Sequence, residues 1–78
     1  MKEQQQKSGL SLRERIDFRL DTLQSWMERD FHLENPSQAY ALTVSISKFW
    51  SVLSEEDREY IQCAQDAINE GWEWNASR

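Results

Sequence analysis

Residues 36–53 carry a single charged side chain, Lys48, although the chain of 78 residues contains 9 basic and 14 acidic ones. Serine and threonine interrupt the stretch throughout, so it is too polar to lie in lipid. A helix with little charge on any face is usually covered by neighbours on most faces. We therefore expect residues 36–53 to form a central helix, packed by other parts of the same chain or by a partner.

The residues before this stretch predict a first helix at about residues 11–30. Ser11 and Glu14 match the capping box, in which both side chains accept hydrogen bonds from backbone amides at a helix start. Phe18 lies about 200° around the helix from Ile16, which places it opposite the apolar stripe. That stripe recurs at spacings of three and four residues and consists of Leu12, Ile16, Leu20, Leu23 and Met27.

Two further helix starts follow. Asn35 provides a cap and Pro36 a first helical residue for a second helix at about residues 36–53. Ser54 is followed by three acidic residues that complement the helix dipole, which predicts a third helix at about residues 55–71. No useful length of the chain alternates with the period of a strand, so the predicted fold class is all-α.

The predicted domain organisation is one helical domain over residues 10–74 with a tail at each side. Residues 1–9 are polar and glutamine-rich, so they cannot offset their ordering entropy and are expected to be disordered. Residues 75–78 form the second tail. Short connections favour antiparallel neighbours, which gives a small three-helix bundle or a helical hairpin whose third helix packs across a dimer.

Apolar side chains outside the predicted core favour the dimer. On the second helix, Tyr40, Val44 and Val52 lie on the side opposite the main apolar stripe. The helix therefore has more apolar surface than the core of one bundle needs. A domain of this size buries only roughly 60–65% of the surface of its unfolded chain, and a single cysteine excludes an internal disulfide. We therefore predict a homodimer with these three residues in its interface.

Residues suited to catalysis or metal binding are few. His32, in a predicted connection, and Cys63, on the third helix, are the only histidine and cysteine, too few for the usual zinc set. Two glycines provide no phosphate-binding loop. We expect a protein that is not an enzyme, with no catalytic residue, cofactor or metal. The chain has one cysteine and no recognisable leader, which predicts a cytoplasmic protein. It also has no apolar run near the ~20 residues of a membrane span, so we expect no membrane partner.

The net charge of −5 originates in the last third of the chain, residues 55–78. An acidic surface repels nucleic-acid phosphates and attracts a basic protein surface. The acidic residues expected to steer such a partner are Glu55, Glu56, Glu59, Glu70 and Glu73. Two alternatives stay open: a DNA mimic that inhibits a nucleic-acid-binding protein, and a helix-turn-helix DNA-binding protein. The second is disfavoured because the arginines of the first helix are interleaved with acidic residues.

Four tryptophans in so short a chain indicate a binding surface, since tryptophan is favoured at interface hot spots. Trp50 falls on the predicted core stripe. Phe18, Trp72 and Trp74 are the predicted aromatic contacts, because Phe18 lies off its stripe and the two tryptophans follow the helix stop at Gly71. The function predicted is a small, acidic, non-enzymatic interaction module that acts as an adaptor or inhibitor of a larger protein.

No motif assigns the chain to a family. Residues 11–18 are slightly similar to the phycobilisome-degradation proteins of cyanobacteria, which are also small, helical and dimeric. Nothing after Asn35 matches those proteins, and no residue role or activity is carried over from them.

Overall fold

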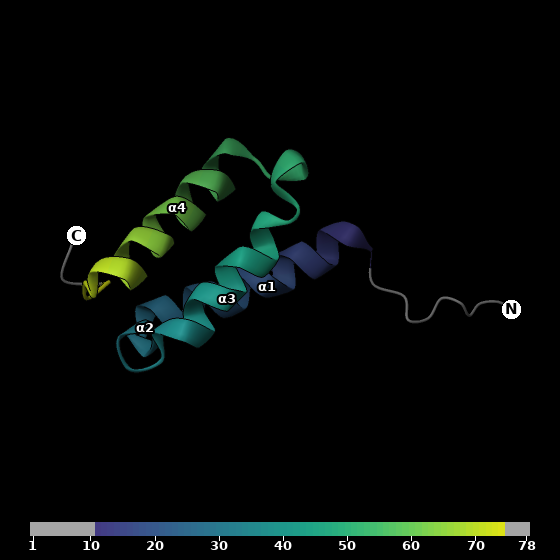
Figure 1. Cartoon of the computed structure of the whole chain (residues 1–78). Coiled ribbons are helices and arrows are strands. Elements are labelled where there is room, and N and C mark those ends of the chain that lie inside the picture. Colours follow the sequence, from purple (N-terminus) through teal and green to yellow (C-terminus); the bar gives the residue numbers. More distant parts are fainter. Residues whose placement is uncertain (1–10, 75–78) are drawn as a thin grey trace, which may run out of the picture.

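The computed structural model describes residues 11–74, and all regular structure in this range is helical (Figure 1). The elements in chain order are α1 (Leu12–Glu28), α2 (Phe31–Glu34), α3 (Pro36–Ser47), the 3₁₀ turn η1 (Trp50–Val52) and α4 (Glu55–Glu70). The all-α prediction is confirmed. The predicted tails, residues 1–9 and 75–78, lie outside the described residues. Within residues 11–74 no helix has the length and apolar character needed to cross a membrane.

The capping box predicted for α1 is present. The Ser11 hydroxyl accepts from the Glu14 N–H at 3.1 Å, and the Glu14 carboxylate accepts from the Ser11 N–H at 2.9 Å. The helix ends slightly before the predicted residue 30, because Asp30 adopts a left-handed backbone conformation with φ of 56°. A non-glycine residue in this conformation redirects the chain, which then enters α2.

The predicted connection at residues 30–34 contains the one-turn helix α2, which the sequence analysis did not anticipate. Phe31 packs its ring against Trp26 of α1, with 4.7 Å between the ring centroids. His32 is buried, although its place in a predicted connection indicated a polar loop residue. α2 therefore forms part of the packed interior at this end of the molecule.

The prediction of one continuous helix over residues 36–53 is wrong after Ser47. The Ser47 hydroxyl donates to the Thr43 carbonyl at 2.9 Å, a bond that competes with regular helical pairing. The chain continues through three-residue turns, with Val52 N–H donating to the Phe49 carbonyl at 2.9 Å. This tighter path buries Leu53 and delivers the chain to the start of α4.

Both predicted ends of α4 are confirmed. The Ser54 hydroxyl accepts from the Asp57 N–H at 3.0 Å and caps the helix start. Gly71 adopts the left-handed conformation, with φ of 73°, and the Trp72 N–H donates to the Ala67 carbonyl at 2.9 Å. This is the Schellman arrangement that commonly ends a helix, and it turns the following residues back toward the bundle.

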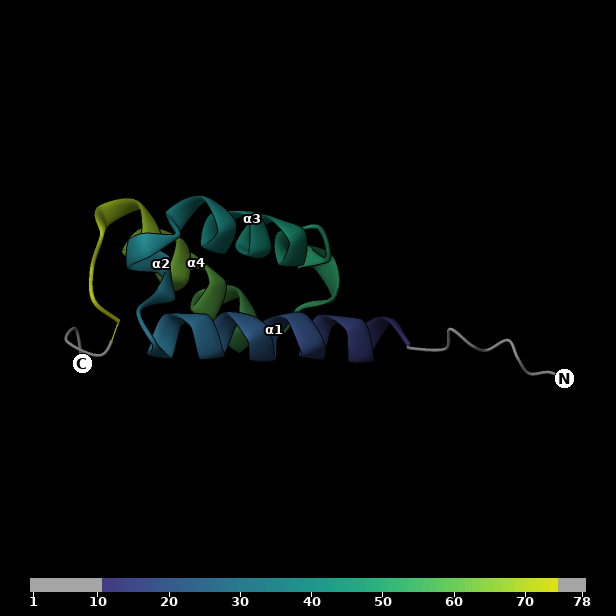
Figure 2. The same ribbon diagram turned by 90° about the horizontal axis from the view of Figure 1, so that it is seen from below.

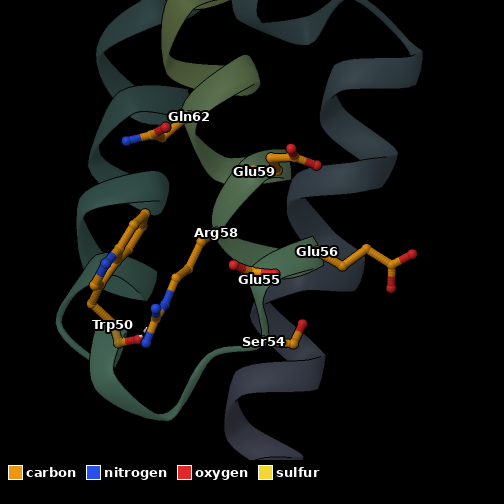
Figure 3. A pocket seen from close by; sticks show the side chains of 7 residues that line it. All are labelled: Trp50, Ser54, Glu55, Glu56, Arg58, Glu59 and Gln62. Atoms are coloured by element: carbon orange, nitrogen blue, oxygen red, sulfur yellow. Dashed lines mark hydrogen bonds between the residues drawn. The ribbon is translucent and has the colours of Figure 1, made fainter.

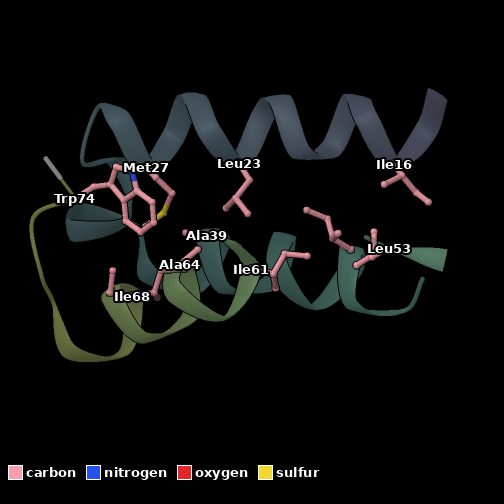
Figure 4. Packing of buried hydrophobic residues seen from close by; sticks show 11 residues of the cluster. Ile16, Leu23, Met27, Ala39, Leu53, Ile61, Ala64, Ile68 and Trp74 are labelled. Carbon is pink, nitrogen blue, oxygen red and sulfur yellow. The ribbon is translucent and has the colours of Figure 1, made fainter. Parts of the chain in front are cut away.

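α3 is the central element, because it packs against α1, α2 and α4. Figure 2 shows α1 and α3 as two layers, with α4 beside them. Buried apolar side chains from the helices, together with Leu53 and Trp74, form one core (Figure 4). Its members are Ile16, Leu23, Met27, Ala39, Ile46, Leu53, Ile61, Ala64, Ala67, Ile68 and Trp74.

Candidate functional site

A row of carboxylates runs along the solvent side of α4. We call it the acidic ridge and define it as Glu55, Glu59, Asp66 and Glu70, all of which are exposed. Their spacing places them within about 60° of one another around the helix, over a length of about 22 Å. None of these carboxylates forms an ion pair within residues 11–74. The ridge is therefore a continuous strip of negative charge.

An open groove of about 750 Å³ lies at the start of this ridge (Figure 3). It is formed where η1 passes the first turns of α4, so it combines one tryptophan face with several carboxylates. Its lining residues are Trp50, Ser54, Glu55, Glu56, Arg58, Glu59 and Gln62. The structure thus brings together Glu55, Glu56 and Glu59 of the predicted partner-binding residues.

Arg58 is the only basic residue of α4, and it is directed away from the ridge toward Trp50 (Figure 3). Its Nε donates to the Trp50 carbonyl at 3.0 Å, and its guanidinium carbon lies 5.5 Å from the centroid of the Trp50 ring. These contacts hold η1 against α4. The same contacts keep the Arg58 guanidinium at one edge of the groove, so its positive charge does not interrupt the row of carboxylates.

Asp57 takes no part in the acidic ridge, because it pairs with α1. Arg13 lies 3.0 Å from the Asp17 carboxylate and 3.3 Å from that of Asp57. This exposed pairing links the first turns of α1 and α4, although pairs of this kind contribute only about 0–1 kcal/mol. Of the acidic residues at the start of α4, Glu55, Glu56 and Glu59 are left to face solvent.

The predicted aromatic contacts do not share one surface. Phe18 is 69% exposed on the side of α1 opposite the buried Ile16, as its spacing predicted. Trp72 is 51% exposed just beyond α4, between the exposed acidic residues Glu70 and Glu73. Trp72 therefore lies just after α4 in the chain, whereas Phe18 belongs to α1.

Trp74 is a core residue, which corrects its predicted place among the surface contacts. The residue is only 8% exposed, and its ring meets Tyr60 edge to face with 5.4 Å between centroids. Its backbone N–H donates to the Asp30 carboxylate at 2.9 Å. Figure 4 shows Trp74 at the Met27 end of the core. The turn at Gly71 makes this possible by reversing the chain, so Trp74 cannot serve as a surface anchor in this structure.

His32 and Cys63 stand in different environments. His32 is 1% exposed, and its Nε2 bonds the Trp72 carbonyl, which assigns the proton to Nε2 because a carbonyl can only accept. Cys63 is a free thiol exposed on α4. Among residues 11–74 no group of three or more histidine, cysteine, aspartate or glutamate side chains is placed to hold a metal ion.

A second surface lies on α3. We call it the uncharged edge and define it as Ser37, Tyr40, Ala41 and Val44, which are exposed on one side of the helix. Tyr40 is 38% and Val44 41% exposed, so these two predicted dimer residues lie together. Val52 is also exposed but belongs to η1. A shallow groove of about 630 Å³ beside this edge is lined by Pro36, Ser37, Tyr40, Ala41, Ile68 and Asn69.

The expectation that residues 36–53 are covered on most faces is wrong for the single chain. Ala39, Thr43 and Ile46 face the core, whereas the uncharged edge faces solvent. The low charge of this segment is therefore only partly explained by packing within one chain. The outer side of α3 is uncharged although it faces solvent in the single chain.

Comparison of the chain with family models, with curated protein sequences and with solved structures finds no match.

Proposed function

We propose that this protein is a small acidic interaction module that binds a basic surface of a larger protein through α4, as an adaptor or inhibitor. The observation that carries the proposal is the acidic ridge. It presents carboxylates near both ends of the helix, and the only basic residue of α4, Arg58, is engaged by Trp50. A strip of one charge sign attracts an oppositely charged surface over distances up to about the Debye length.

The contact surface includes more than charge. The groove at the start of α4 adds the face of Trp50, and Trp72 with Glu73 continues the surface past the far end of the helix. Aromatic side chains supply the desolvated contacts that give an interface its affinity, while exposed carboxylates mainly raise the association rate. Phe18 would provide a separate contact on α1.

This role requires no chemistry from the protein, so we propose that it is neither an enzyme nor dependent on a cofactor. The single exposed thiol, Cys63, favours a reducing, cytoplasmic compartment. We further propose that the chain acts as a homodimer, since Tyr40, Val44 and Val52 expose apolar surface in the single chain.

DNA mimicry is the second candidate, and the linear arrangement of the acidic ridge favours it. Four carboxylates follow one line of about 22 Å, and a DNA strand also presents a row of phosphates, one for each rise of about 3.4 Å along the duplex axis. We do not favour the helix-turn-helix alternative, because two of the arginines it would need are engaged within the chain. Arg13 pairs with Asp17 and Asp57, and Arg19 donates to Ser45 at 3.0 Å.

Affinity capture with charge variants tests the proposal. A ridge variant, Glu59→Gln/Glu70→Gln, is compared with a matched control on other exposed positions, Asp21→Asn/Glu28→Gln, which has the same net charge. Partners captured by the wild-type chain from a native cell extract should bind the ridge variant about 3- to 100-fold more weakly and the control almost normally. Equal capture by both variants would contradict the proposal.

Salt and DNA then separate the two candidates. Binding through the ridge should weaken as salt rises from about 0.05 M to about 0.5 M, because exposed charges are screened. A DNA mimic must also compete with duplex DNA for the captured protein. A partner that binds the chain and the duplex at the same time would exclude mimicry and leave the adaptor role.

A further inference from the structure

We infer that a second copy of this chain docks on the uncharged edge of α3 and that the two α3 helices run antiparallel across a two-fold axis. The inference rests on the homodimer proposed above and specifies its contact surface. The edge consists of Ser37, Tyr40, Ala41 and Val44, and Figure 2 shows α3 as an outer layer of the molecule, on the side away from α1.

The charge of the chain selects this surface. Two copies that each carry a net charge of −5 repel one another, and contact through α4 would bring the carboxylates of two acidic ridges together. α1 also exposes acidic residues along its length. Residues 36–47, in contrast, contain no charged side chain. The uncharged edge is therefore a helix face on which two copies can meet without placing like charges opposite one another.

Charges just outside the edge select the antiparallel orientation. Glu34 is exposed immediately before α3, and Lys48 is exposed immediately after it. A parallel pair of helices would place Lys48 opposite the partner's Lys48. An antiparallel pair instead places Lys48 near the partner's Glu34 twice, once at each end, and also opposes the two helix dipoles. The charges of Glu34 and Lys48 thus favour the antiparallel orientation of the two α3 helices over the parallel one.

Side-chain size on the edge suits close helix packing. Ser37 and Ala41 are one helical turn apart and small, so two helix backbones can approach closely between them. Tyr40 and Val44 form a parallel row along one side of this small-residue pair. The groove beside the edge, whose lining includes Ile68 and Asn69 of α4, offers a site for the partner's Tyr40. A tyrosine suits such a place because its ring is apolar and its hydroxyl is polar.

The size of the helix sets the expected affinity. α3 contains 12 residues, so this contact buries less than the roughly 1,200 Å² of a stable interface, and the dimer should be of the weak, micromolar kind. Its formation should therefore depend on concentration. The wild-type mass, measured by sedimentation equilibrium from about 1 μM to about 1 mM, should rise from that of one 9.3 kDa chain to twice that value.

Substitutions on the edge test where the copies meet. Ala41→Lys should abolish the dimer, because two lysines would be buried near the two-fold axis, while an exposed helical position tolerates lysine without loss of the fold. Circular dichroism at low concentration checks that the monomer remains folded. Phe18→Lys is the matched control at an exposed apolar residue outside the edge, and it should retain the dimer.

A charge exchange tests the orientation. Lys48→Glu should weaken association about 2- to 10-fold, and the double variant Glu34→Lys/Lys48→Glu should restore it, because each pair is then attractive again. A wild-type chain that stays monomeric throughout the concentration range overturns both the homodimer and this inference. A dimer that survives Ala41→Lys, or that the charge exchange does not restore, overturns the inference while the homodimer itself stands.

Discussion

The backbone N–H of Trp74 donates to the carboxylate of Asp30 at 2.9 Å, although 44 residues separate them. A second bond beside it joins His32 Nε2 to the Trp72 carbonyl. The segment after α4 is therefore fastened to the corner between α1 and α2. Trp74 enters the core at this point and meets Tyr60, so this end of the chain contributes to stability.

Truncation of Trp74 should be costly. Trp74→Ala removes a buried indole and leaves a cavity at the Met27 end of the core, which should lower the free energy of unfolding by about 3 kcal/mol. Trp72→Ala is the matched control, because Trp72 is largely exposed and its loss should cost under about 0.5 kcal/mol. Urea unfolding followed by circular dichroism measures both. Equal stability of the two variants would show that Trp74 does not complete the core in solution.

Position 30 should tolerate substitution by asparagine but not by alanine. The residue combines a left-handed backbone, with φ of 56°, and a carboxylate that accepts from Trp74. Asparagine keeps an acceptor oxygen and tolerates this conformation, so Asp30→Asn should cost under about 1 kcal/mol. Asp30→Ala loses the acceptor and strains the backbone, for a combined cost of about 2 kcal/mol. The melting temperature should be highest for the wild type, lower for Asp30→Asn and lowest for Asp30→Ala. A higher melting temperature for Asp30→Ala than for Asp30→Asn would contradict the role of Asp30 as acceptor for Trp74.

Arg58 should act on the groove through Trp50. Arg58→Gln removes the cation above the ring, so Trp50 should become more accessible to acrylamide quenching and stability should fall by about 1 kcal/mol. Binding of a basic partner should not weaken, because the substitution makes the groove more negative. A partner that is lost with Arg58→Gln would instead indicate that the arginine itself is recognised.

Local signals in the sequence predicted where the long helices start, but the predicted cap at Asn35 is wrong, because its side chain forms no capping bond to α3. Ser11 and Ser54 both accept a bond from the backbone amide three residues later, and the stop at Gly71 depends on its own left-handed backbone. The spacing of Ile16, Leu23 and Met27 likewise identified the buried side of α1. These features are decided within one or two helical turns, which is the range that a local pattern describes.

Contacts between distant residues account for what the sequence did not predict. The burial of His32 depends on a carbonyl 40 residues away, and that of Trp74 on a carboxylate 44 residues away. The early end of α3 has a similar origin, since the turn after Ser47 is needed to bring Leu53 into a core shared with α1 and α4. The acidic side of α4 was foreseen, but its groove was not, because Trp50 reaches it only through η1.

The insertion of Trp74 into the core also bears on how the protein is made. Helices α1 to α3 leave the ribosome first, and in that state Leu23 and Met27 lack the cover that α4 and Trp74 later provide. A nascent chain at this stage exposes apolar surface, the condition that chaperones recognise. The interior can therefore close fully only after residue 74 has been synthesised.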